Sequence, residues 1–321
     1  MVEAGVAVQT THEERTAKGE RRRRSEAEED EAEEAEAEEE EIAADEETLK
    51  PLGAEAPEIA SPGARIGERR LVRPFVGDAV TSFIGGMSVS FGAVAMAWAA
   101  ALVGGGAGEV VGALLFPVGF LILLLGKSEL FTENFFLPVM AVLERRGTLR
   151  QLVAHWSVTL ASNLLGCFVF ALLISRPGVL DSGPAGYLVE LATRKVETPL
   201  ATSFVQAIFA GWLMTLLTWL LLAARGIGPR LAVIWAMGAL IVLGRFNHVV
   251  ISAAELFMAM LLGAPVGVMD WAADSFLPAL LGNVVGGTVF VTLLFYIQAR
   301  YHDAEAARRS AFGPGPGRRV P

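Results

Sequence analysis

Ionisable and polar side chains occur inside two long apolar stretches of the sequence, at 108–143 and 229–263. Charged groups at the bilayer centre cost about 3 kcal/mol even on insertion scales, so they normally face the interior of a helical bundle and pair there. Such side chains are candidates for binding or passing a polar solute. The first stretch contains Lys127, Ser128, Glu129, Thr132, Glu133 and Asn134, and the second contains Arg245, Asn247, His248, Ser252 and Glu255.

Of the four histidines, His248 is the one that lies in the middle of an apolar stretch. An ordinary pKa near 6.5 lets histidine exchange a proton near neutral pH. Protonating an acid of pKa near 4 at pH 7 costs about 4 kcal/mol, whereas burying an unpaired anion in hydrocarbon costs tens of kcal/mol by ideal Born solvation. A histidine and a hydroxyl donor such as Thr132 therefore suit the passage of small weak acids. The alternative is that His248 only makes an interhelical hydrogen bond.

Lys127 and Arg245 each follow a glycine inside these stretches. One interpretation is that they attract an anion toward the middle of the membrane. The other is a buried lattice of salt bridges, with Glu129, Glu133 and Glu255 as the available partners. For Glu255, the sequence suggests Lys127 or Arg245 as the cation that pairs with it.

The composition places these residues in a multi-span membrane protein. The chain is 53% hydrophobic and 19% charged, and its mean hydropathy is +0.48, values too apolar for a soluble domain of 321 residues. Two of its six apolar blocks are roughly 35 residues long, or about 54 Å as straight helix against a hydrocarbon core of about 30 Å. These two helices, the second and the fifth, must therefore break at the polar residues. The blocks lie at 75–103, 108–143, 151–174, 200–223, 229–263 and 273–298.

Lysine and arginine residues are distributed unequally between the two sides of these spans. Because cytoplasmic loops carry the excess of positive charge, the distribution places both termini in the cytoplasm of a multi-pass protein of the cell (inner or plasma) membrane. One side holds Arg69, Arg70, Arg73, Arg145, Arg146, Arg150, Arg225, Arg230, Arg300, Arg308 and Arg309, and the other holds Arg176, Arg194 and Lys195.

The region before the first span is strongly acidic. Residues 1–68 hold 22 Asp and Glu against 8 Lys and Arg, and 15 of the acids lie in 25–47. Such a segment cannot bury enough apolar surface to offset the entropy of ordering. The acids also neutralise the basic run at 21–24, so a nucleic-acid partner is not expected. The sequence predicts a disordered cytoplasmic tail at 1–70, a six-span domain at 71–300 and a cytoplasmic C-terminal tail at 301–321.

Short patterns recur in the two halves of the chain. Glu129-Leu-Phe131 returns as Glu255-Leu-Phe257, and Asn163-Leu-Leu-Gly166 returns as Asn283-Val-Val-Gly286. Chance recurrence in a chain rich in Leu and Gly is the alternative. Because a repeat of three spans is odd, the second copy must enter from the opposite face, which gives inverted repeats whose broken helices meet near the midplane.

The successive motifs resemble the signatures of the formate/nitrite transporter family over about residues 75–298. This resemblance implies a homopentamer of aquaporin-like protomers embedded in the lipid bilayer. Each protomer would carry small monovalent anions, or their conjugate acids together with a proton. The motifs are Phe116-Pro-Val-Gly119, Ser128-Glu-Leu-Phe-Thr-Glu-Asn134, Asn163-Leu-Leu-Gly166, Gly211-Trp212, Gly244-Arg-Phe-Asn-His248 and Gly282-Asn-Val-Val-Gly-Gly287.

The resemblance implies that Thr132 is the loop threonine of the broken second helix and that His248 is the central pore histidine. Arg230 stands roughly where the family has a lysine. The chain departs from the family where Glu133 replaces a glycine, where Val249 replaces a serine, and where Lys127 replaces a small residue. We expect a substrate pore formed by Thr132, His248, Lys127 and Asn134, with ion-pairing or gating roles for Glu129, Glu133, Arg245, Glu255 and Arg230.

Other classes of protein fit the sequence less well. One cysteine, no HExxH or GxSxG motif and a single histidine at membrane depth argue against an enzyme, and neither a cofactor nor a metal is expected. A channel for neutral small solutes would share the architecture, but the chain has no Asn-Pro-Ala pair and carries ionisable residues at both breaks. A membrane scaffold that transports nothing is the remaining alternative.

Overall fold

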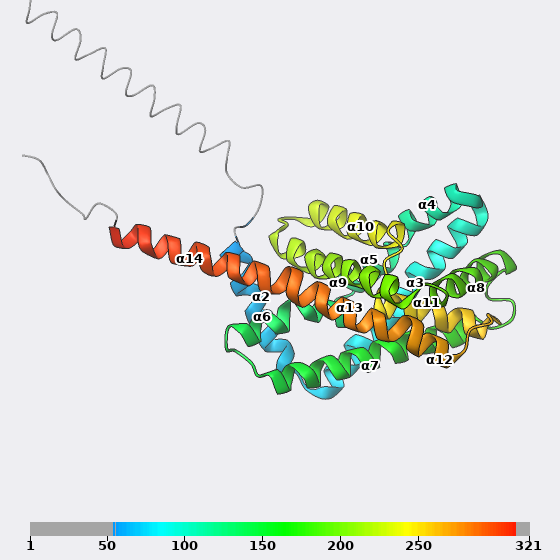
Figure 1. Ribbon diagram of the computed structural model, residues 1–321, viewed down its shortest axis with the longest axis horizontal. Helices are drawn as coiled ribbons and strands as arrows, with labels where there is room; N and C mark the ends of the chain where they lie inside the picture. Colours follow the sequence, from blue (N-terminus) through cyan, green and yellow to red (C-terminus); the bar gives the residue numbers. More distant parts are fainter. Residues whose placement is uncertain (1–53, 55, 313–321) are drawn as a thin grey trace, which may run out of the picture. The chain divides into compact units, whose positions relative to one another are not determined.

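The computed structural model describes residue 54 and residues 56–312. Within that part of the chain every regular element is helical (Figure 1). The elements are α2 (Ala56–Leu71), α3 (Phe75–Val103), α4 (Gly105–Leu115), α5 (Val118–Leu125), η1 (Phe131–Phe135), α6 (Leu137–Leu143), α7 (Leu149–Ile174), α8 (Ser182–Val196), α9 (Leu200–Ala223), α10 (Ile227–Leu243), α11 (Val249–Leu261), α12 (Val268–Asp270), η2 (Trp271–Phe276), α13 (Leu277–Gly287), η3 (Thr288–Leu293) and α14 (Leu294–Phe312).

The helix lengths identify an all-helical, multi-span membrane protein. Five helical segments of the described chain are long and apolar enough to cross a membrane, and three apolar segments are shorter. Two of the short segments, α10 and α11, take the place of the fifth span, and the third completes the second span. The long segments are 75–103, 105–125, 149–174, 200–223 and 268–305, and the short ones are 131–143, 227–243 and 249–261.

Both overlong spans are interrupted after a glycine at the end of a helix. Gly126 caps α5 and Gly244 caps α10, and the residue after each has a positive φ, +55° at Lys127 and +53° at Arg245. A left-handed residue cannot continue a right-handed helix, so the chain leaves the axis at these points. In the first case it forms the short helix η1 and re-enters an α-helix at Leu137, and in the second it re-enters an α-helix at Val249.

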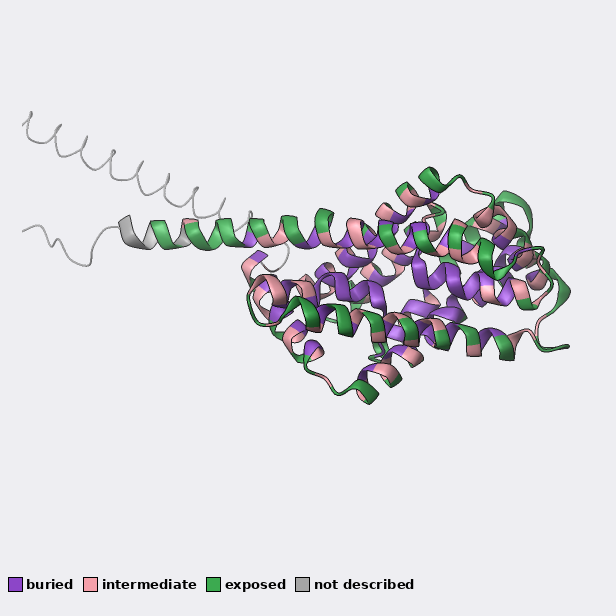
Figure 2. Ribbon diagram, turned by 60° about the horizontal axis from the view of Figure 1, so that its bottom comes forward, coloured by how far each residue is buried: buried purple, intermediate pink, exposed green. Residues whose placement is uncertain are grey.

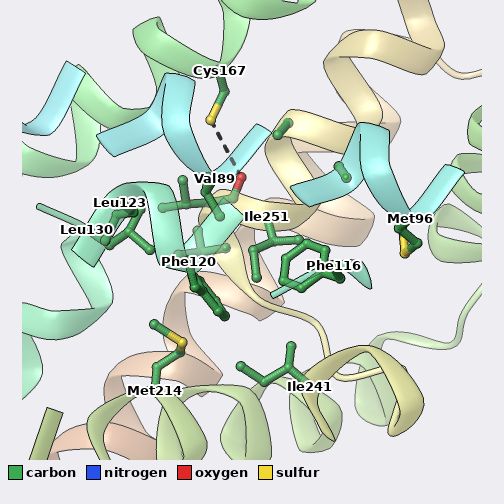
Figure 3. Close-up of a cluster of buried hydrophobic side chains, with 14 of the residues drawn as sticks. Val89, Met96, Phe116, Phe120, Leu123, Leu130, Cys167, Met214, Ile241 and Ile251 are labelled. Carbon is green, nitrogen blue, oxygen red and sulfur yellow. Dashed lines mark hydrogen bonds between the residues drawn. The ribbon is translucent and has the colours of Figure 1, made fainter. Parts of the chain in front are cut away.

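A large apolar cluster packs the helices around the two interruptions (Figure 3). Phe120 and Leu123 of α5 lie among Met96 of α3, Met214 of α9 and Ile251 of α11, and all are almost fully buried. Figure 2 shows that buried residues gather where helices contact each other, whereas the outward faces are exposed. Since lipid is as apolar as leucine, close packing rather than burial itself is what this cluster contributes to stability in a bilayer.

The prediction of a disordered tail at 1–70 is wrong for residues 56–70, which form most of α2. Ile59 and Ala64 of α2 are buried in a cluster with Phe136, Met140 and other residues. A Cβ on Gly67 would lie 1.8 Å from the carbonyl oxygen of Leu137, so only glycine allows this approach of the two backbones. Composition missed the helix because its small residues gain contacts only when α6 is present.

The remaining parts of the predicted tails fall largely outside the described residues. Residues 1–53, 55 and 313–321 are in this group, and they include the acidic run at 25–47. The boundary predicted at residue 300 falls inside α14, which runs to Phe312 without interruption.

Candidate functional site

Thr132 and His248 meet at the two interruptions. Thr132 lies in the short helix η1 after the first break, and His248 is the N-cap of α11 after the second. Oγ1 of Thr132 is 2.9 Å from Nε2 of His248, and both residues are 0% exposed. The structure therefore brings together the two residues that the sequence suggested for the centre of the pore.

The backbone of α11 defines which nitrogen of His248 carries the proton. The Ile251 N–H donates to Nδ1 of His248 over 3.2 Å, as an N-cap side chain does. Since Nδ1 accepts, the neutral ring holds its hydrogen on Nε2 and donates it to Oγ1 of Thr132. The hydroxyl of Thr132 is then left with its own hydrogen to donate, which suits the binding of an oxyanion.

Asn163 of α7 and Asn283 of α13 hold the two interruptions in the same way. Oδ1 of Asn163 accepts from the N–H of Phe131 at 2.7 Å, and its Nδ2 donates to the carbonyl of Glu129 at 2.9 Å. Oδ1 of Asn283 accepts from the N–H of Val249 at 2.8 Å, and its Nδ2 donates to the carbonyl of Asn247 at 2.9 Å. Each asparagine thereby satisfies two backbone groups that the broken helix leaves without helical partners.

Asn163 and Asn283, which share a motif in the sequence, make equivalent contacts, with the N–H of Phe131 in one case and the N–H of Val249 in the other. The match between the two Glu-Leu-Phe patterns has the wrong register, because Glu129 lies in the loop after α5 whereas Glu255 lies inside α11. Three-letter similarity cannot detect this difference, since register depends on which backbone groups the asparagines reach.

A cluster of charges lies beside Thr132 where α2 meets the first interruption. We call it the α2-side cluster. Glu133 and Asn134 directly follow Thr132, and both interact with Arg70, at 3.5 Å from a carboxylate oxygen of Glu133 and 2.7 Å from the amide oxygen of Asn134. Glu129 pairs with Arg70 at 2.5 Å and also with Arg73. The cluster consists of Arg70, Arg73, Asp78, Glu129, Glu133, Asn134 and His155.

The ion pairs predicted for Glu129 and Glu133 are thus present, but their partners lie before the first span. In the sequence, Arg70 and Arg73 indicated only the orientation of the spans. His155 Nδ1 lies 2.5 Å from Oδ2 of Asp78, which in turn accepts from Arg73 at 3.2 Å through Oδ1. Asp78 belongs to α3 and His155 to α7, and these residues are close because the two helices pack against each other, a relationship that their sequence positions do not reveal.

A cavity of about 410 Å³ lies on the side of α8, and Asn247, the residue before His248, is part of its lining. We call it the α8-side cavity. It holds three cations and two carboxylates: Arg194 and Arg245 contact Glu109 at 3.2 and 2.8 Å, and Lys195 contacts Glu255 at 2.6 Å. Its polar lining includes Glu109, Tyr187, Arg194, Lys195, Arg245, Asn247 and Glu255.

The expected partners of Glu255 and Arg245 need correction. Glu255 pairs with Lys195 rather than with Lys127 or Arg245, and Arg245 pairs with Glu109. Lys195 belongs to α8, in the long loop between two spans, so its distance in sequence concealed the contact. A lysine near the end of an amphipathic loop helix was the one available signal.

Tyr187 belongs to the same cavity and lies in α8, outside the spanning helices. Burial raises the pKa of Tyr187 to about 12, and the nearby carboxylates of Glu255 and Glu109 act in the same direction. A neutral phenol in this cavity adds no charge at physiological pH.

Lys127 and Arg230 do not join the central pair in this chain. Both are exposed, and Nε of Arg230 donates to the carbonyl of Ala224 at 3.2 Å. Among the described residues, no contact of Lys127 with Thr132 or His248 is present. Lys127 therefore does not line the centre that Thr132 and His248 form, and its left-handed φ of +55° marks it as the residue that ends the helix.

The fold and this site together define a class of protein. Several spanning helices surround a buried polar pair, and that pair is flanked by charged groups at both interruptions. This is the organisation of a membrane transporter or channel that passes a small polar solute.

The chain belongs to the formate/nitrite transporter family, because the family profile described as "Formate/nitrite transporter" matches residues 57–297. Members of this family are channels and transporters, not enzymes. The uncharacterized transporter YrhG of Bacillus subtilis (strain 168) is 28% identical over 268 residues, which cover 78% of this chain and 95% of YrhG.

Two solved structures share the fold. An FNT family ion channel is 21% identical with a TM-score of 0.68, covering 76% of this chain and 98% of the channel. A pentameric formate channel with formate bound is 20% identical with a TM-score of 0.59, covering 70% of this chain and 96% of that channel.

Proposed function

We propose that this protein moves small monovalent anions or their conjugate acids, of the formate and nitrite type, across the plasma membrane. The observation that carries the proposal is the buried contact of 2.9 Å between Thr132 and His248. This pair presents a hydroxyl donor and an imidazole at one point, next to Asn134 on one side and Asn247 on the other. Membership of the formate/nitrite transporter family supports the same substrate class.

Passage as the neutral acid avoids the largest energetic barrier. Protonating a carboxylate of pKa near 4 at pH 7 costs about 4 kcal/mol, far less than the tens of kcal/mol for an unpaired anion in hydrocarbon. In our proposal Thr132 donates its hydroxyl hydrogen to an oxygen of the arriving anion. The anion then waits within reach of Nε2 of His248.

Proton exchange at His248 needs a second proton on the ring. This proton comes from the external medium together with the anion. Because Ile251 N–H occupies Nδ1, the proton can bind only when that hydrogen bond opens, and opening the bond alone costs about 1 kcal/mol net. The imidazolium then gives its Nε2 proton to the anion and becomes neutral with its hydrogen on Nδ1. Return of the proton to Nε2 restores the resting contact with Thr132.

The direct test is flux in proteoliposomes that contain the purified protein. We expect uptake of labelled formate and nitrite that increases when the external medium is made more acidic. Faster permeation of water or glycerol without anion flux would instead identify a channel for neutral solutes. If liposomes with and without protein behave alike for all four solutes, the scaffold interpretation replaces ours.

The proposed assembly is a homopentamer of aquaporin-like protomers, each built from two inverted three-helix repeats with its own pore. The equivalent contacts of Asn163 and Asn283 support the repeats, and the pentameric channel of the same fold supports the assembly. Native mass spectrometry of the detergent-solubilised protein tests the number of subunits. Accessibility of single cysteines at residues 300 and 176 tests whether the termini are cytoplasmic.

A further inference from the structure

The two side chains of the Lys195–Glu255 ion pair differ in their exposure, and this difference affects anion binding. Nζ of Lys195 lies 2.6 Å from Oε2 of Glu255 and 2.7 Å from Oγ of Ser252. The side chain of Lys195 is 21% exposed, whereas that of Glu255 is 3% exposed. A solute in the α8-side cavity can therefore reach the ammonium group, while the carboxylate approaches it from within the protein.

The ammonium group of Lys195 is only partly coordinated. Of its three N–H donors, one is accepted by Oγ of Ser252, and within the described part of the chain Oε2 of Glu255 contacts Nζ as an ion-pair partner. Within the described residues, Lys195 is the cation that contacts the carboxylate of Glu255. The carboxylate of Glu255 thus contacts Nζ of Lys195 at the position that the carboxylate of a dissolved anion would take.

The Lys195 ammonium is connected to the central histidine by a short series of polar contacts. Ser252 accepts from Lys195 and donates to Oδ1 of Asn247 at 2.8 Å. Asn247 directly precedes His248, and its Nδ2 donates to Ser203 at 2.8 Å. Polar contacts therefore link the Lys195 ammonium through Ser252 to the residue that precedes His248.

The other cations of the cavity differ from Lys195. Arg194 and Arg245 share Glu109, and their side chains are 38% and 70% exposed. Exposed pairs of this type contribute little because water screens them. Glu109 consequently offers a control for Glu255, since both are carboxylates that line the same cavity.

We propose that Glu255 is a built-in competitor for the anion-binding position at Lys195, and that it sets the affinity of the α8-side cavity for the transported anion. The inference rests on the proposed anion transport. A dissolved anion must take the place of the Glu255 carboxylate on Nζ of Lys195 before it advances toward His248. Affinity on this side is therefore lower than the charge of Lys195 alone would produce.

The first experiment replaces the carboxylate by its neutral isostere and measures anion binding without transport. We expect detergent-solubilised Glu255→Gln to unfold at a lower temperature than the unsubstituted protein when no anion is added. Sodium formate should then raise its unfolding temperature steeply, because formate occupies the position that the carboxylate has left. The unsubstituted protein and Glu109→Gln should respond weakly, with half-saturating formate concentrations about tenfold higher.

The outcomes separate occupancy of one site from a general effect of charge. Equal formate stabilisation of Glu109→Gln and Glu255→Gln would overturn the proposal, since a general field would then explain both. Lack of any formate response in Glu255→Gln would overturn it as well. If Glu255→Gln cannot be purified, the double variant Lys195→Gln/Glu255→Gln keeps the volume of both side chains and removes the charge pair. Formate should not stabilise this double variant at concentrations that saturate Glu255→Gln. If Glu255→Gln is missing, the reference is the formate concentration that stabilises the unsubstituted protein. A response of the double variant equal to that of the unsubstituted protein would contradict the proposal.

Flux measurements add a test that fails separately from the proposed function. With formate supplied on the α8 side, Glu255→Gln should lower the half-saturating concentration about tenfold relative to the unsubstituted protein. If neither protein transports formate or nitrite, the proposed function fails while the binding result stands by itself. If both transport with the same half-saturating concentration, the function holds and the role of Glu255 is refuted.

Discussion

Thr132 and His248 are 116 positions apart in sequence, yet they share a hydrogen bond of 2.9 Å at the point where the second and fifth spans are interrupted. His248 is oriented by the first turn of α11, through the N–H of Ile251. The ring is therefore held at both nitrogens, one by a side chain and one by the backbone. The central pair is accordingly rigid at rest, and substitutions there should change function more than folding.

Substitution of His248 tests its part in proton exchange. His248→Asn keeps a polar group of smaller size and should preserve folding while removing the rise of formate uptake between pH 8 and pH 5. His248→Phe should abolish uptake, because a phenyl ring has no nitrogen to exchange a proton and fills the same space. Uptake of labelled formate into proteoliposomes across this pH range measures both effects. Unchanged pH profiles in the two variants would leave His248 with a structural role alone.

Substitution of Thr132 separates the hydroxyl from the shape of the side chain. Thr132→Val leaves the Nε2 hydrogen of His248 without its acceptor in a buried site, at a cost of about 1–3 kcal/mol. We expect formate flux to fall at least tenfold, a change that corresponds to about 1.4 kcal/mol. Thr132→Ser retains the hydroxyl and serves as the matched control. Equal flux through the valine and serine variants would remove the hydroxyl from the mechanism.

Truncation at the N-terminus distinguishes α2 from the residues before it. Removal of residues 2–53 should leave assembly and flux largely intact, because this truncation keeps α2 and its packing against α6. Removal of residues 2–71 should destabilise the protein strongly, since Glu133 then loses Arg70 inside the membrane domain and Glu129 keeps only Arg73. Loss of a partner from a buried pair costs about 3–5 kcal/mol. Thermal unfolding and size-exclusion chromatography in detergent measure this difference, and equal behaviour of the two truncations would contradict it.

The equivalence of Asn163 and Asn283 predicts similar effects of their substitution. Each side chain makes one hydrogen bond through Oδ1 and two through Nδ2, all with backbone groups near the interruptions. At about 1 kcal/mol net for each bond, leucine at either position should cost about 3 kcal/mol. The unfolding temperatures of Asn163→Leu and Asn283→Leu provide the comparison. A large effect at one position only would show that the two interruptions are not supported alike.

Tyr187 provides a pH prediction outside the spanning helices. Because burial raises its pKa to about 12, above the ordinary value of 10, the folded protein retains the phenol proton more firmly than the unfolded chain. Its contribution to stability is complete below pH 10 and is lost as the pH rises to about 12. Tyr187→Phe should therefore leave the pH dependence of flux unchanged from pH 5 to pH 9. An altered profile in this range would show that the hydroxyl participates in binding or proton movement.

The sequence by itself determined the membrane class and the approximate positions of the spans, because hydropathy and length depend on local composition. It also determined that the second and fifth spans must break, since a straight helix of their length exceeds the bilayer. His248 was identifiable for a similar reason, as an ionisable residue isolated within an apolar stretch.

Only the tertiary structure decided which residues face one another. The pairing of Glu255 with Lys195, the register of the repeat, and the packing of α2 on α6 depend on backbone approach between distant segments. A charge pattern shows that a buried carboxylate needs a cation, but several cations in the sequence satisfy that need equally. Distance selects among them, and distance is a property of the folded chain.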